Sequence, residues 1–168
     1  MTYDLQAMEA IKQLKYKYVR SLDSANQDGL RDCFTEDAHI CFKGGVYTVE
    51  FTGRDNILEF LATSFHSRAA ASHQVHHPVI ELISDTEATG QWSLQDVYHD
   101  LNARVIISGA SEYVDTYVKG SDGAWRISDS GYTRLFEMTQ PMPEQMVCTY
   151  HKLAETGKDL GLAPAETD

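Results

Sequence analysis

Cysteine is scarce in this chain of 168 residues, and its three copies do not form the patterns that cysteine-based sites need. Cys33, Cys41 and Cys148 contain no CxxC pair, and their odd number argues against a disulfide framework or a thiolate zinc site. We therefore expect reduced, buried thiols, as is usual in a cytoplasmic protein.

Positive charge and long apolar runs are also lacking. The chain has 14 Lys and Arg against 25 Asp and Glu, a formal net charge of −11 with histidine neutral. This balance argues against nucleic acid or an anionic membrane surface as a partner. No apolar run approaches the roughly 18 residues of a membrane-spanning helix, and the first residues do not resemble a signal peptide. We predict a cytoplasmic protein without nucleic-acid or membrane partners.

What is present is an ordinary globular composition with a clear change of hydrophobic period. Apolar residues at three- and four-residue steps predict an amphipathic helix over 4–24, with Asp4 at its N-cap. Further local patterns predict a short helix over 30–34, a strand hairpin over 38–42 and 46–51, and a helix over 54–68. The period then changes to two and predicts four long strands, over 73–83, 87–99, 103–119 and 124–137.

Helices followed by a long antiparallel meander indicate an α+β domain, with the helices on one face of a curved sheet. The open mouth of such a cone is a common place for a pocket. We expect this domain over residues 1–140, followed over 141–168 by an extension with a helix at 144–157 and a polar tail at 158–168. The strand near 104–119 has apolar residues on both faces, so we expect a homo-oligomer, a dimer or a trimer.

The sequence contains no Walker loop, GxGxxG, GxSxG or HExxH motif. Instead, five polar residues interrupt apolar segments: Tyr18, Asp23, His73, Asp96 and Arg134. Each also has a purely structural interpretation, such as a core tyrosine, a solvated or capping aspartate, a structural histidine with its hydrogen bonds satisfied, or a surface ion pair. A register-inverting bulge would likewise turn Asp96 outward.

Aromatic residues accompany two of these polar positions. By strand alternation, Asp96 shares a face with Trp92, Leu94 and Tyr98. The same alternation places Arg134 on one face with its neighbours in the last strand, Tyr132 and Phe136.

Four histidines, His73, His76, His77 and His99, suggest a metal site at first sight. Strand geometry argues against it, because His73 and His77 would lie about 13 Å apart at about 3.3 Å per residue. His76 would point to the opposite face, and no carboxylate–histidine spacing matches a known site. We predict no metal.

Several segments, over residues 18–23, 30–38 and 53–57, resemble the amino-terminal half of SnoaL-like proteins in the nuclear transport factor 2-like superfamily. Residues 73–78 and 86–90 are similar to the histidine strand and the next hairpin of that family. The resemblance implies a cone-shaped, cystatin-like fold, with a mixed, mostly antiparallel sheet and N-terminal helices on its concave face. It is greatest for the branch that contains scytalone dehydratase, bile-acid 7-alpha-dehydratase and lindane dehydrochlorinase.

The branch uses a His–Asp dyad, which the resemblance places at His73 and Asp23, with Tyr18 at the position of an upstream tyrosine. In this role His73 abstracts a proton, while Asp23 orients it and stabilises the imidazolium. Tyr18 would donate a hydrogen bond to a developing oxyanion. Tyr18 and Asp23 are five residues apart, about 140° around a helix, so both reach a cavity only at a frayed or inward-turning helix end.

The same resemblance places a further acid and an arginine at Asp96 and Arg134. Asp96 or the protonated His73 would help hydroxide to leave as water, and Arg134 would bind an anionic or carbonyl group of the substrate. We expect aromatic residues to line the apolar cavity beside them: Trp92, Tyr98, Tyr113 and Tyr132.

These expectations describe a lyase of the dehydratase type that acts on a small, hydrophobic, cyclic substrate. Acid–base groups suffice for elimination, so we expect neither metal nor organic cofactor. Two alternatives stay open: an isomerase or polyketide-type cyclase on the same scaffold, and a non-catalytic ligand-binding or subunit module.

Overall fold

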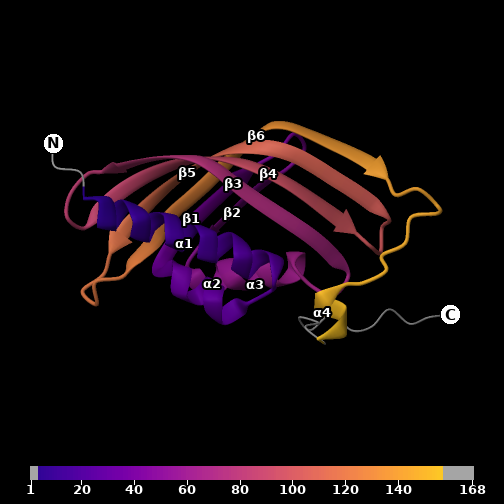
Figure 1. Ribbon diagram of the computed structural model, residues 1–168, viewed down its shortest axis with the longest axis horizontal. Coiled ribbons are helices and arrows are strands. Elements are labelled where there is room, and N and C mark those ends of the chain that lie inside the picture. Colours follow the sequence, from indigo (N-terminus) through magenta and orange to yellow (C-terminus); the bar gives the residue numbers. More distant parts are fainter. Residues whose placement is uncertain (1–3, 157–168) are drawn as a thin grey trace.

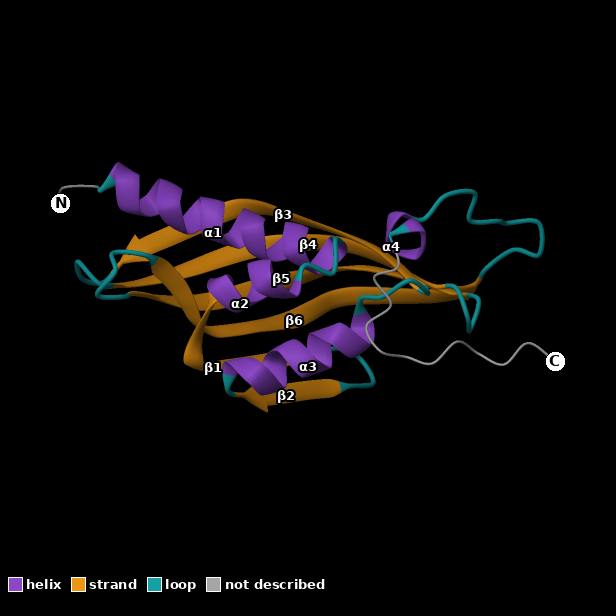
Figure 2. Cartoon of the chain, turned by 90° about the horizontal axis from the view of Figure 1, so that it is seen from below, coloured by secondary structure: helices purple, strands orange, loops and turns teal. Residues whose placement is uncertain are grey.

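One curved sheet with helices on its concave face makes up most of the computed structural model, which describes residues 4–156 (Figure 1). Helices α1 (Leu5–Asp23), α2 (Gln27–Cys33) and α3 (Arg54–Ser64) lie side by side on this face, as the view from below shows (Figure 2). The short helix α4 (Lys152–Glu155) lies near the end of α3. The predicted α+β class is confirmed.

The sheet has six strands in the order β2-β1-β6-β5-β4-β3. Neighbours pair antiparallel except β1 and β6, which run parallel, so the sheet is mixed as expected. The strands are β1 (Phe34–Lys43), β2 (Thr48–Thr52), β3 (Ala69–Leu82), β4 (Glu87–Asp100), β5 (Val105–Lys119) and β6 (Trp125–Pro141).

Helix α1 follows directly from its sequence. The Asp4 carboxylate accepts hydrogen bonds from the backbone N–H groups of Gln6 and Ala7, each at 3.0 Å, which confirms the predicted N-cap. Such a cap stabilises a helix by about 1 kcal/mol. The predicted apolar stripe is buried and forms part of the core between helices and sheet, with Ile11 and Tyr18 fully excluded from solvent.

Several predicted boundaries move because long-range pairing extends the strands, and the starts of β1 and β3 are two of them. Strand β1 begins at Phe34, which pairs with Ile127 of β6, and β3 begins at Ala69, which pairs with Asp100 of β4. Helix α3 ends at Ser64, earlier than predicted, since the backbone of Phe65 is extended.

A bulge in the β5–β6 ladder decides which β6 side chains enter the molecule. Ala110 pairs with Phe136 but Ser111 pairs with Arg134, so β6 carries one extra residue at this point. Phe136 is consequently 53% exposed, and the prediction that it shares a face with Arg134 is wrong. Glu137 takes its place beside Arg134 instead.

The C-terminal extension differs from the prediction. Within the described residues, the helix expected over 144–157 is limited to Lys152–Glu155, and Arg104 Nη2 donates to the carbonyls of Pro143 and Met146 in the non-helical segment before it, at 2.9 and 3.4 Å. The polar tail expected over 158–168 lies outside the described residues.

The three cysteines are free, but the expectation that all are buried is wrong, since Cys148 is exposed. Within residues 4–156, none of the helices combines the length and hydrophobicity needed to cross a membrane.

Candidate active site

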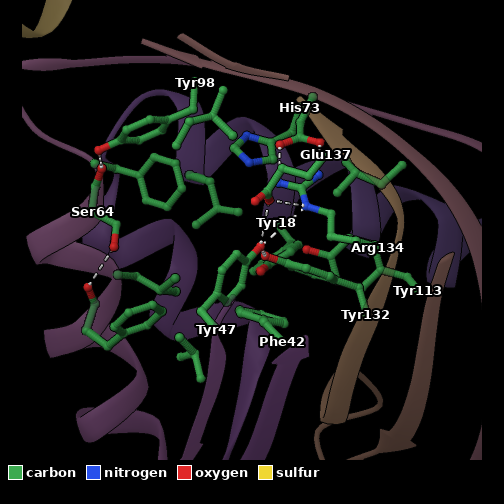
Figure 3. Close-up of a pocket in the computed structure, with 18 residues that line it drawn as sticks. Tyr18, Phe42, Tyr47, Ser64, His73, Tyr98, Tyr113, Tyr132, Arg134 and Glu137 are labelled. Carbon is green, nitrogen blue, oxygen red and sulfur yellow. Dashed lines mark hydrogen bonds and ion pairs between the residues drawn. The ribbon is translucent and has the colours of Figure 1, made fainter. Parts of the chain in front are cut away.

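A cavity of about 270 Å³ lies between the concave face of the sheet and the helices (Figure 3). Its apolar wall consists of Leu22, Phe42, Val49, Phe60, Leu61, Phe65, Leu94 and Ile107. Its polar wall consists of Tyr18, Tyr47, Ser64, His73, Asp96, Tyr98, Tyr113, Tyr132, Arg134 and Glu137. A mainly apolar space with a few convergent polar groups is typical of a small-molecule site.

His73 and Asp23 are joined by two hydrogen bonds. The imidazole Nδ1 lies 2.6 Å from Asp23 Oδ1, and the backbone N–H of His73 donates to Asp23 Oδ2 at 3.0 Å. The two side chains are 12% and 28% exposed. Because an ionised carboxylate only accepts hydrogen bonds, Nδ1 carries the imidazole proton and Nε2 is the nitrogen left to accept one.

Helix α1 and strand β3 position this pair. Asp23 is the last residue of α1, whose core stripe holds it against the start of β3. Asp23 does not line the cavity; it faces a surface groove, and His73 lines both spaces. The five-residue spacing from Tyr18 is thereby explained, because Tyr18 enters the cavity while Asp23 contacts His73 from behind.

Tyr18 and Tyr113 are buried phenols in the cavity wall. Burial raises the pKa of Tyr18 above its ordinary value of 10.0, although a hydrogen bond with Tyr113 opposes the shift. Burial likewise raises the pKa of Tyr113 well above that value. Both side chains are therefore protonated at neutral pH and can donate hydrogen bonds.

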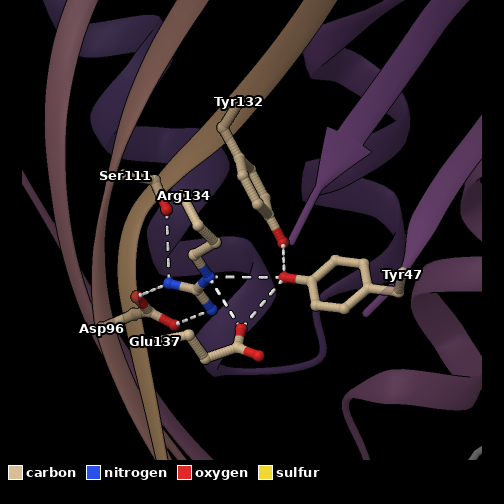
Figure 4. A network of polar contacts seen from close by, with 6 residues as sticks. All are labelled: Tyr47, Asp96, Ser111, Tyr132, Arg134 and Glu137. Carbon is tan, nitrogen blue, oxygen red and sulfur yellow. Dashed lines mark hydrogen bonds and ion pairs between the residues drawn. The ribbon is translucent and has the colours of Figure 1, made fainter. Parts of the chain in front are cut away.

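A network of polar contacts surrounds Arg134 (Figure 4). Its Nη1 and Nη2 atoms bind the two oxygens of Asp96, the second at 2.9 Å, in a bidentate ion pair. Its Nε donates to Glu137 Oε2 at 3.0 Å and to the Tyr47 hydroxyl at 3.3 Å. Nη1 also donates to Ser111 Oγ at 3.3 Å.

Two tyrosines extend this network. The Tyr47 hydroxyl donates to Glu137 Oε2 at 3.4 Å and lies 2.9 Å from the hydroxyl of Tyr132. Since the Tyr47 proton goes to the carboxylate, the Tyr132 hydroxyl is the donor between the two phenols. Burial raises the pKa of Tyr132, and its contact with Tyr47 raises it further.

Most residues selected from the sequence meet at this cavity. Tyr18, His73, Asp96, Tyr98 and Arg134 line it, as do Tyr113 and Tyr132. Tyr98 also links β4 to α3, because its hydroxyl donates to the carbonyl of Ser64 at 3.0 Å. The alternative outward orientation of Asp96 is excluded, since only 7% of the residue is exposed.

Trp92 does not line the cavity. It lies in the core, where its Nε1 donates to the Tyr117 hydroxyl at 2.9 Å. His76 and His77 lie next to a bulge in β3, where His77 has a φ of 51°. Among the described residues, no group of three or more His, Cys, Asp or Glu side chains is arranged to hold a metal ion.

Sequence reasoning missed Tyr47 and Glu137. Tyr47 falls within the strand predicted over 46–51, but β2 begins only at Thr48, so Tyr47 lies in the hairpin loop and strand alternation does not indicate its direction. Glu137 lies three residues after Arg134, so simple strand alternation places it on the other face. Only a sequence signal for the bulge between Arg134 and Glu137 would have identified Glu137 as a cavity residue.

A model of the SnoaL-like domain family matches residues 4–130 of this chain. Among solved structures, a candidate scytalone dehydratase from Novosphingobium aromaticivorans is similar, with a TM-score of 0.70 and 24% identity over 86% of this chain and 97% of that one. The hexachlorocyclohexane dehydrochlorinase LinA-type3 from Novosphingobium barchaimii has a TM-score of 0.70 and 18% identity over 86% and 95% of the two chains. A candidate aromatic ring hydroxylase from Novosphingobium aromaticivorans has a TM-score of 0.71 and 17% identity over 84% and 96%. These similarities show a shared fold.

Proposed function

Because the chain belongs to the SnoaL-like domain family of the nuclear transport factor 2-like superfamily, we propose that it is a cofactor-independent lyase that removes water from a small, hydrophobic, cyclic substrate. The observation that carries this proposal is the Asp23–His73 pair, which places an oriented imidazole in the wall of the cavity. The dehydratase and dehydrochlorinase among its structural neighbours support it, although fold alone does not define an activity.

His73 acts first as a general base. Its Nε2 takes a proton from a substrate carbon made acidic by an adjacent carbonyl, and the electron pair of the broken C–H bond forms a C=C bond. The neighbouring C–O bond breaks, and its electron pair leaves with the hydroxyl group. The Asp23 carboxylate stabilises the imidazolium that forms in this step.

The leaving hydroxyl needs a proton, and the protonated His73 supplies it. Asp96 is poorly suited to this task because Arg134 binds both of its oxygens in a bidentate ion pair, which leaves them turned away from a leaving group. The proton taken from carbon thus leaves in the water molecule, and the imidazole returns to its starting state. The step balances without any further reactant.

Tyr18 stabilises the charge that develops on the carbonyl oxygen. Tyr113 donates its proton to the Tyr18 hydroxyl, so the Tyr18 O–H is the one left to donate to the substrate, and a donor fixed in advance stabilises an oxyanion more strongly than water does. The aromatic wall, with Phe65 packed against the His73 ring at 5.5 Å between centroids, suits a ring-shaped substrate.

The test is a screen of cyclic β-hydroxy ketones, with products identified by mass spectrometry. We expect a product lighter by one water, and a loss of about 10²- to 10⁴-fold in kcat/KM for His73→Gln. His76→Gln is the matched control, since His76 lies on the same strand but does not line the cavity, and it should retain full activity.

The outcomes separate the alternatives. A product of unchanged mass that still depends on His73 would identify an isomerase or cyclase. Turnover that survives His73→Gln, or ligand binding without turnover across the screen, would contradict the lyase and support a binding or subunit module.

A further inference from the structure

Arg134 is the only positively charged side chain that lines the cavity, apart from the titratable His73, within the described residues. A guanidinium in such a wall commonly anchors a carboxylate or phosphate of the ligand. Arg134 is only 10% exposed, so it has little contact with water and depends on its partners in the protein.

Those partners already occupy the edges of the guanidinium that recognise anions. Asp96 binds the edge formed by Nη1 and Nη2, and Glu137 binds the Nε side. The two carboxylates are themselves shielded, with 5% and 17% of their side chains exposed. The Tyr47 hydroxyl reinforces the second contact by bonding to both Arg134 and Glu137.

Two features of the backbone of β5 and β6 allow this network to form. A Cβ atom at Gly109 would lie 3.1 Å from Arg134 Nη1 and 2.5 Å from the carbonyl oxygen of Phe136. Glycine at this position of β5 therefore leaves room for the guanidinium to cross the strand and reach Asp96 on β4. The bulge in the same ladder turns Glu137 toward the guanidinium.

The charges of this network sum to minus one. Asp96 and Glu137 each contribute a negative charge and Arg134 contributes one positive charge. The nearby His73 is paired with the negative Asp23. An anionic group that entered the cavity would therefore meet excess negative charge on side chains that are largely shielded from solvent.

We propose that this cavity selects uncharged substrates and that Glu137 is the residue that sets the selectivity, by neutralising the side of Arg134 that Asp96 leaves open. The inference rests on the proposed function in taking the cavity as the substrate site. It revises the expected role of Arg134, which here organises the wall and does not bind an anion.

The test compares two ligands of nearly equal shape, naphthamide and the naphthoate anion, by isothermal titration calorimetry at neutral pH. We expect wild-type protein to bind naphthamide at least about tenfold more tightly than naphthoate. Glu137→Gln should reduce this preference by about tenfold, through stronger naphthoate binding. The matched control is Glu112→Gln, which removes the same charge from an exposed position of β5 that does not line the cavity and should keep the wild-type preference.

Several results would overturn the proposal. They are equal or stronger binding of naphthoate by the wild type, an unchanged preference in Glu137→Gln, or no binding of either ligand at millimolar concentration. The wild-type comparison needs no substitution, so it holds even if Glu137→Gln is unstable. This test measures binding and not turnover, so the preference for naphthamide can hold even if the protein is not a lyase. Conversely, proof that the protein dehydrates anionic substrates would refute the selectivity proposal and leave the lyase proposal standing.

Discussion

The imidazole of His73 separates the Asp23 carboxylate from the cavity. It contacts Asp23 through Nδ1 at 2.6 Å and lines the cavity itself, whereas Asp23 faces a groove on the other side. In the proposed reaction, Asp23 therefore acts on a substrate only through His73, as a positioning residue that selects the tautomer and stabilises the imidazolium.

Replacing Asp23 with Asn should separate positioning from binding. The amide keeps the shape but lacks the charge, and its NH₂ group can hold His73 in the wrong tautomer. We expect kcat to fall by about 10²- to 10⁴-fold while naphthamide binding changes little. Asp85→Asn, in an exposed turn, is the control. Wild-type kcat in Asp23→Asn would show that His73 does not need this partner.

A buried ion pair under the cavity should dominate stability. Lys15 Nζ lies 2.8 Å from Asp115 Oδ2 and neither side chain is exposed, while Tyr117 and Ser130 each donate to Asp115 at 2.7 Å. Burial lowers the pKa of Lys15, and Asp115 opposes this shift. Lys15→Met would leave the Asp115 charge without its counter-ion, which costs about 3–5 kcal/mol of unfolding free energy.

Urea unfolding measures this cost, and two further variants serve as comparisons. Lys15→Met combined with Asp115→Asn should recover part of the loss, since no buried charge remains. Lys17→Met is the matched control on the same helix, because Lys17 pairs with Asp32 at 3.0 Å at the surface with 46% of its side chain exposed. Such pairs contribute about 1 kcal/mol or less. Equal losses of unfolding free energy in Lys15→Met and Lys17→Met would contradict the expectation that the buried ion pair matters more than the surface pair.

The buried tyrosines predict a loss of stability at alkaline pH. Burial raises the pKa of Tyr18, Tyr113 and Tyr117 above 10.0 in the folded protein, whereas unfolded tyrosines ionise near about 10. The folded state therefore binds more protons than the unfolded state above this pH. Its stability is unaffected by these groups below pH 10 and falls as the pH rises further.

Tyrosinate absorbance and urea unfolding, followed together from pH 9 to 12, test this expectation. The buried phenols should ionise only as the protein unfolds, in a steep second phase. Tyr113→Phe should reduce the amplitude of that phase. Ionisation of all tyrosines in one phase with the fold intact would contradict the prediction.

We still expect a homo-oligomer, and the outer face of the sheet is where we expect its interface. Val114, Phe136 and Met138 on β5 and β6 are 56%, 53% and 62% exposed, on strands whose other face lines the cavity. Exposed apolar groups of this kind are commonly covered by a second copy. We expect a dimer or trimer by size-exclusion chromatography with light scattering, shifted toward monomer by Phe136→Ser. Val46→Ser, in the exposed hairpin, should leave the mass unchanged, and a wild-type monomer at all concentrations would refute the expectation.

Periodicity and turn signals in the sequence placed the first three helices and the six strands, though not their exact ends or the C-terminal helix, because the 3.6- and two-residue periods are local properties of the backbone. The N-cap at Asp4 and the stripe that buries Tyr18 follow from the same local pattern. The residues of the dyad could be chosen only through the family resemblance, since no spacing along the chain links Asp23 to a histidine 50 residues later.

Tertiary structure decided the composition of the cavity wall. The β5–β6 bulge brought Glu137 beside Arg134 and moved Phe136 outward, and a hairpin contributed Tyr47 from far along the chain. Trp92, on the strand face that the sequence assigned to the cavity, lies in the core because the hydroxyl of Tyr117 and the ring of Tyr16 hold it there. Register shifts and contacts between distant strands leave no periodic trace in the sequence, because one inserted residue reverses the face of every residue after it.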